Sequence, residues 1–165
     1  MTLKFDGYTL EPISINNGIG QGDLLSMGLY QYYNADLIEV PKDPGESAMA
    51  YVDNSAMIVI TDSFLEAHRE LLSMMTRDGG VRDWSSLHNS SLKYSKLMLE
   101  DFTHSCSLKS RPLLCLPQIT VQPTESTKYL GVVFDQNLSW KQQHTHVIGK
   151  GTKWAMQIRR LVKPS

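Results

Sequence analysis

Cysteine is scarce in this sequence: the two that occur, Cys106 and Cys115, have no further cysteine pair beside them. A zinc site needs additional cysteine or histidine ligands at characteristic spacings, and a disulfide framework is typical of short, cysteine-rich secreted chains. Neither pattern is present. The sequence therefore predicts no zinc site and no disulfide, and both cysteines are interpreted as reduced thiols.

Long hydrophobic runs are also lacking. A helix that crosses a bilayer takes about 20 consecutive apolar residues, and no stretch of this chain approaches that length. The first residues do not have the basic and then apolar layout of a secretory signal. We therefore expect a soluble, intracellular protein with no membrane partner.

The whole chain has little excess charge, with a formal net charge of -1, and 41% of its residues are hydrophobic. These values exclude a disordered or collagen-like chain, and a length of 165 residues favours one globular domain. The charges are nevertheless divided unevenly, because residues 1–53 sum to -6 and residues 128–165 sum to +6. The basic segment predicts a surface that binds a polyanion, with a solvated helix face as the alternative.

Local patterns in the first half predict an α+β domain with mainly antiparallel strands. The expected elements are a hairpin of residues 3–5 and 9–15 around Asp6-Gly7, a helix over 24–40 capped by Asp23, a polar loop over 41–46, a hairpin of 48–52 and 56–60 around Asp53-Asn54-Ser55, and a helix from Asp62 or Ser63 to Asp78.

The second half is expected to be irregular over residues 81–91 and then mainly extended. Strands are predicted over 92–102, 113–116, 119–122 and 129–134. An amphipathic, basic helix is predicted over 139–163, with an apolar face that includes His144 turned toward the core.

Two segments are candidates for chemistry. In Ala50-Tyr51-Val52-Asp53-Asn54 an aspartate stands at a hairpin turn, where a carboxylate would be exposed yet rigidly placed, as two-metal phosphoryl transfer requires. The alternative is that Asp53 favours the turn for backbone reasons alone.

The second candidate is the glycine-rich loop Gly18-Ile19-Gly20-Gln21-Gly22-Asp23. Its glycines allow a substrate to approach the backbone, and amides at a helix start attract phosphate. The alternative is a plain strand-to-helix connection with Asp23 as the cap.

The two candidates in this order, separated by one helix and a loop, resemble the motif pair of reverse transcriptases, most closely those of fungal non-long-terminal-repeat retrotransposons. Lys96-Leu97-Met98 resembles the lysine-bearing strand of that family's palm, and the segment from Lys128 to Val132 resembles the hairpin that grips the primer. The resemblance implies an antiparallel palm-type sheet with packing helices. Residues 1–138 would form a partial palm, and residues 139–165 would begin a thumb-like helix.

The resemblance also implies roles for individual residues. Asp53 would bind Mg²⁺, with Tyr51 and Asn54 beside it at the catalytic turn. The glycine loop and the lysine-bearing strand would bind nucleotide or template through Gly20, Gln21, Gly22, Ser26 and Lys96, although Lys93 competes with Lys96 for that match. Contacts to nucleic acid would come from Lys128, Lys150, Lys153 and Arg160.

Departures from the family pattern weaken the expected activity. Asn54 stands where the family has a second aspartate, and a neutral amide is a poorer ligand for a hard cation. The family's earlier aspartate-bearing strand and fingers do not match any segment. The resemblance therefore implies a truncated domain, ancestrally an RNA-directed DNA polymerase using two Mg²⁺ ions, that is inactive as this fragment. The alternatives are a non-catalytic nucleic-acid-binding remnant and an open reading frame that gives no stable protein.

Overall fold

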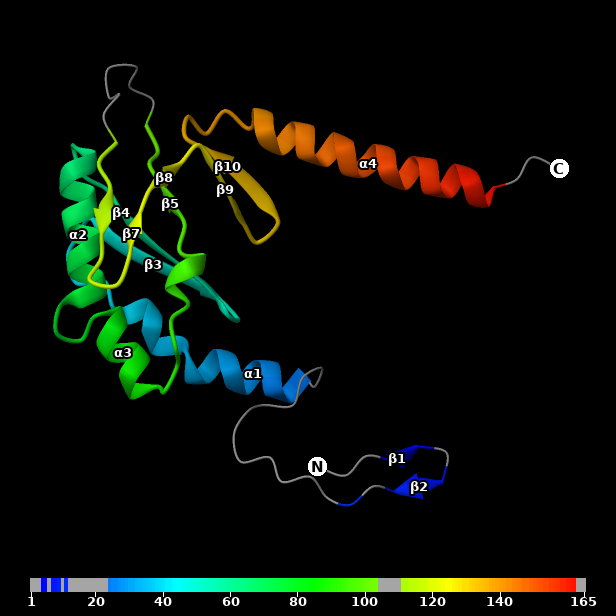
Figure 1. Ribbon diagram of the computed structural model, residues 1–165, viewed down its shortest axis with the longest axis horizontal. Helices are drawn as coiled ribbons and strands as arrows, with labels where there is room; N and C mark the ends of the chain where they lie inside the picture. Colours follow the sequence, from blue (N-terminus) through cyan, green and yellow to red (C-terminus); the bar gives the residue numbers. More distant parts are fainter. Residues whose placement is uncertain (1–3, 6, 10, 12–23, 104–110, 163–165) are drawn as a thin grey trace.

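The computed structural model describes residues 4–5, 7–9, 11, 24–103 and 111–162 (Figure 1). The glycine loop from Gly18 to Asp23 lies outside these residues, as does the predicted cap Asp23. The first described elements are β1 (Lys4–Phe5) and β2 (Tyr8–Thr9), which pair antiparallel. Gly7 lies between them with a φ of 77°, which glycine adopts without strain. A hairpin is therefore present where predicted, whereas residues 10 and 12–15 of the predicted second strand lie outside the described residues.

The helix predicted over residues 24–40 divides into two parts. α1 (Leu24–Tyr33) is followed by the 3₁₀ helix η1 (Ala35–Glu39). Asn34 separates them: its N–H donates to Tyr30 O, and its carbonyl accepts from the N–H of Leu37. Leu37 and Val40 are buried, whereas α1 buries no residue. The tighter turn of η1 thus brings the second part of the segment onto the core.

The hairpin β3 (Glu46–Tyr51) and β4 (Asn54–Val59) is the longest strand pairing among the described residues. Tyr51 pairs with Asn54, so the turn consists of Val52 and Asp53. The predicted hairpin is confirmed, but its turn lies one residue earlier than expected, and Asn54 belongs to a strand. Glu46, expected in the preceding loop, is the first residue of β3 and is buried.

Two helices follow the hairpin. α2 (Phe64–Thr76) begins where predicted, because Ser63 Oγ accepts the N–H of Glu66 as an N-cap. α3 (Val81–Leu87) overturns the prediction of an irregular segment. A Cβ at Gly80 would lie 2.5 Å from Met74 O, so only glycine permits this close turn between the helices. The short α3 holds too few turns to show a clear helical period in the sequence.

The segment after α3 contains short strands. The strand predicted over residues 92–102 is mostly wrong, since this stretch forms the 3₁₀ helix η2 (Tyr94–Lys96) and only the short β5 (Leu99–Glu100). β6 (Leu114–Cys115) and β7 (Thr120–Val121) pair antiparallel within the predicted ranges. β8 (Pro123–Thr124) pairs parallel with β5, which the sequence did not predict.

The single strand predicted over residues 129–134 is wrong, because this region is a hairpin. β9 (Ser126–Tyr129) pairs antiparallel with β10 (Val132–Asp135). Leu130 and Gly131 form the turn, with positive φ values of 48° and 89°. The hairpin that the resemblance implied for residues 128–132 is therefore present.

The last element is the basic helix α4 (Lys141–Leu161), within the predicted range. Figure 1 shows α4 extending away from the rest of the described chain. None of its residues is buried. The expectation that its apolar face, including His144, packs against the core is wrong: His144 is exposed, and so are Val147, Ile148 and Ile158.

Two small clusters of buried side chains form the core of the described residues. One joins η1 to α3 and the other joins the strands β5, β6 and β7, and Met75 of α2 packs against both. The predicted mixture of helices and small antiparallel sheets is confirmed. Its assignment to a palm, and the division at residue 138, stay predictions.

Candidate functional site

The tip of the β3–β4 hairpin carries three of the predicted site residues. Asp53 is exposed in the turn, and Asn54 Nδ2 donates to Asp53 Oδ1 at 3.0 Å. Tyr51 faces Asn54 across the strand pair and leaves 55% of its surface exposed. Val52 adopts a φ of 54°, a conformation that a β-branched residue rarely takes. The structure thus brings Tyr51, Asp53 and Asn54 together at one exposed, tightly turned tip.

The β9–β10 hairpin reaches this tip. Tyr129 Oη donates to the carbonyl oxygen of Asn54 at 3.5 Å, a long contact between residues far apart in the sequence. Burial raises the pKa of the Tyr129 phenol. Tyr129 was not among the predicted site residues, although it stands inside the segment resembling a primer-gripping hairpin, and that motif could have identified it.

A second contact ties β9 to the segment containing Lys96. Thr127 Oγ1 donates to Met98 Sδ at 3.4 Å. Three segments on which the resemblance to reverse transcriptases rests, around Asp53, Met98 and Tyr129, are therefore linked by contacts of the Tyr129 and Thr127 side chains.

The remaining predicted residues lie away from the tip or outside the described chain. Lys96 ends η2 and is exposed, so the predicted lysine-bearing strand is wrong at this residue; Lys93, the competing candidate, is exposed immediately before η2. Lys128 is exposed on β9, and Ser26 is half-buried in α1. Gly20, Gln21 and Gly22 lie outside the described residues.

The hairpin tip does not fit a pair of Mg²⁺ ions. A two-metal site needs several carboxylates, and here one carboxylate, Asp53, stands beside the neutral amide of Asn54. Within the described ranges, the only group of three potential ligands whose atoms lie close together is Asp43, Glu46 and Glu70.

The acidic group formed by Asp43, Glu46 and Glu70 already has a cation beside it. Arg77 Nη1 and Nη2 donate to the two carboxylate oxygens of Glu46 at 2.8 and 2.6 Å, and Nη1 lies 3.7 Å from Asp43 Oδ2. The hydrogen bond from Arg77 is the main reason that the pKa of Glu46 is lowered. Because Arg77 also donates to Val40 O at 2.7 Å, this arrangement joins the end of α2 to the start of β3 and serves the fold.

The predicted nucleic-acid contacts Lys150, Lys153 and Arg160 are all exposed along α4. Lys141 and Arg159 add two more positive charges to this helix, and residues 136–165 contain no acidic residue. The start of α4 is fixed to the hairpin, because Gln143 Oε1 accepts the N–H of Val133 at 2.8 Å. The structure therefore presents an exposed, positively charged helix whose first turn is hydrogen-bonded to β10.

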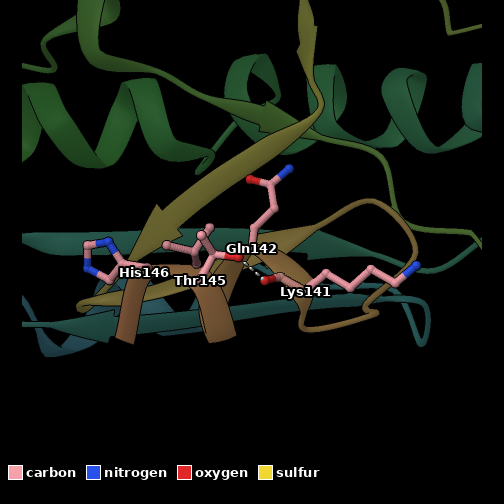
Figure 2. Close-up of a pocket in the computed structure, with 5 residues that line it drawn as sticks. Lys141, Gln142, Thr145 and His146 are labelled. Atoms are coloured by element: carbon pink, nitrogen blue, oxygen red, sulfur yellow. Dashed lines mark hydrogen bonds between the residues drawn. The ribbon is translucent and has the colours of Figure 1, made fainter. Parts of the chain in front are cut away.

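A wide hollow of about 450 Å³ lies between β10 and the first turns of α4. Val133, Lys141, Gln142, Thr145 and His146 line it. Figure 2 shows that the side chains of Lys141 and His146 point in opposite directions. Thr145 Oγ1 donates back to the carbonyl of Lys141 at 3.0 Å. These side chains do not converge on one ligand, and the hollow is not a candidate active site.

No helix among the described residues is long and apolar enough to span a membrane. Comparison with known proteins found no matching family model, no matching curated protein and no matching solved structure.

Proposed function

We propose that this chain is a reverse-transcriptase-type palm domain that binds primed nucleic acid and does not by itself transfer nucleotides. The observation that carries the proposal is the contact between Tyr129 and Asn54. It places the hairpin resembling a primer grip against the hairpin resembling the polymerase turn, as a palm that positions a primer end requires.

The charge on α4 supports the binding half of the proposal. Five basic residues and no acidic residue lie along one exposed helix. Lysine and arginine on such a surface neutralise backbone phosphates with little preference for sequence. A primed duplex along α4 would then have its primer end directed toward the β9–β10 hairpin, to which α4 is anchored.

The scarcity of carboxylates at the tip supports the non-catalytic half. Nucleotidyl transfer by two Mg²⁺ ions, the reaction that the resemblance implies for the ancestral enzyme, needs carboxylates that hold both ions. Among the described residues, only Asp53 supplies one at the turn.

Fluorescence anisotropy with a labelled, primed RNA template tests the binding. We expect binding that weakens as salt rises, because counterions are released. Changing both Lys150 and Lys153 to glutamine should weaken binding and reduce the salt slope by about 2, at about 1 per lost phosphate contact. Arg82→Gln, which removes one positive charge, is the control, since Arg82 is an exposed base on α3 and α3 lies away from α4 (Figure 1). Salt-independent binding, or an equal loss in the control, would refute the proposed binding surface.

Primer extension with Mg²⁺ tests the absence of catalysis. We expect no primer extension above the no-protein background with either the wild-type chain or Asp53→Ala. Extension by the wild-type chain that disappears in Asp53→Ala would contradict the proposal, because a working site would then exist around Asp53.

A further inference from the structure

Three aromatic rings form a row where the β9–β10 hairpin meets α4. The ring centroids of Phe102 and Phe134 lie 6.4 Å apart, and those of Phe134 and Trp140 lie 5.8 Å apart. Both ends of the row are open to solvent, since Phe102 is 45% exposed and Trp140 is 51% exposed. Rings that only fill a core are shielded from solvent by neighbouring side chains. Here the rings of Phe102 and Trp140 remain accessible to a ligand.

The backbone holds Trp140 in place at some conformational cost. Trp140 adopts a φ of 63°, a left-handed conformation that bulky residues rarely take. The connection that leads to it is tied down by Asp135, whose Oδ1 accepts the N–H groups of Asn137 and Ser139 at 3.2 and 2.9 Å. A strained residue inside a tightly bonded connection keeps the indole beside Phe134 rather than on a flexible loop.

The bases that follow the Trp140 end of the row favour an anionic ligand there. Lys141 follows Trp140 directly, and α4 continues with four further basic residues. The carboxylate of Asp135 is buried and turned toward backbone N–H groups, and the N–H of Ser139 is the main reason that its pKa is lowered. A ligand with a flat aromatic part and a negatively charged backbone matches both features. A nucleic acid single strand has both.

We infer that Trp140, supported by Phe134 and Phe102, is a stacking site for an unpaired base of a nucleic acid strand. The inference deepens the proposed function and rests on it: α4 holds the phosphates of the duplex, and the aromatic row holds the first unpaired base beyond its end. Stacking recognises the flat face that every base has, so the site selects single-stranded character and not sequence.

The test compares two labelled substrates by anisotropy, a blunt RNA–DNA duplex and the same duplex with a single-stranded template extension. We expect the wild-type chain to bind the extended substrate more tightly by about fivefold to a hundredfold, the range that one stacked base supplies. Trp140→Ala should remove this preference and leave binding of the blunt duplex intact. Phe102→Ala should reduce the preference.

Trp154→Ala is the control, because Trp154 is also an exposed tryptophan (65%, against 51% for Trp140) and lies on α4, about 21 Å further along at 1.5 Å per helical residue. It should retain the preference. The emission of the buried Trp84 reports whether each variant is folded. In a Trp154→Phe background, adding the extension should quench tryptophan emission, and the further change Trp140→Phe should remove that quenching.

Each outcome decides between the two proposals. A preference retained in folded Trp140→Ala, or lost equally in Trp154→Ala, overturns the stacking site. Wild-type binding of the blunt duplex with no preference for the extension also overturns the stacking site but leaves the proposed function standing. No binding of either substrate by the wild-type chain overturns both.

Discussion

Replacing Arg77 by methionine removes the guanidinium that binds Glu46 and leaves a carboxylate buried without its partner. The Glu46 side chain is 1% exposed and receives two hydrogen bonds from Arg77. Breaking a buried ion pair from one side costs about 3–5 kcal/mol. Glu46 Oε2 keeps the backbone N–H groups of Lys42 and Asp43, at 2.8 and 3.4 Å. We therefore expect a loss at the lower end, about 3 kcal/mol of unfolding free energy.

The pH dependence gives this prediction a second readout. The folded-state pKa of Glu46 is lowered, chiefly by the hydrogen bond from Arg77, while burial acts in the opposite direction. In the wild-type chain this carboxylate therefore contributes stability above its unfolded pKa, and that contribution is lost as pH falls through the folded pKa. In Arg77→Met only the hydrogen bonds from the backbone N–H groups still favour the charged form of Glu46, while burial disfavours it. Protonation of Glu46 therefore removes the unpaired charge. The difference in unfolding free energy between the wild-type chain and Arg77→Met should therefore be smaller at about pH 4 than at about pH 7.

Urea unfolding followed by circular dichroism at both pH values measures these differences. Glu46→Gln in the Arg77→Met background should recover part of the loss, because it removes the stranded charge. Arg82→Met, which changes an exposed arginine on α3, should stay within about 0.5 kcal/mol of wild type. A loss below about 1 kcal/mol in Arg77→Met, or one that does not change with pH, would refute the assignment of this pair as a buried structural contact.

Three further substitutions test local features of the fold. Val52→Gly should raise the melting temperature through about 1 kcal/mol of relieved strain, since Val52 has a φ of 54°; a lower melting temperature would contradict that conformation. Ser63→Ala should cost about 1 kcal/mol in urea unfolding by removing the cap on the Glu66 N–H, whereas Ser63→Asp should retain it; equal losses in both would argue against the cap. His68→Ala should cost about 2–4 kcal/mol, because Asp101 Oδ1 lies 2.7 Å from His68 Nε2 and both residues are buried; a near-neutral result would show that this contact contributes little.

The local sequence was sufficient to predict those elements whose structure depends only on residues a few positions apart in the chain. The turn at Asp53, the start of α2 at Ser63 and the course of α4 follow from turn chemistry, capping and helical spacing, which a short window contains. The same rules failed at η2 and α3, where the regular stretch is too short for a period to show. They also failed at Tyr129, where one apolar run proved to be the two halves of a hairpin closed by Leu130 and Gly131.

Other features were decided only by tertiary structure, because they join residues that no local pattern relates. Glu46 and Arg77 are 31 positions apart, and Tyr129 meets Asn54 across 75 positions. Residue types and spacing made Asp53 a candidate from the sequence, but only the fold brings Tyr129 to the adjacent Asn54. The apolar spacing of α4 predicted a buried face, yet burial requires a partner surface as well as an amphipathic pattern. In the described chain α4 extends away from both core clusters, so its apolar and basic faces remain exposed.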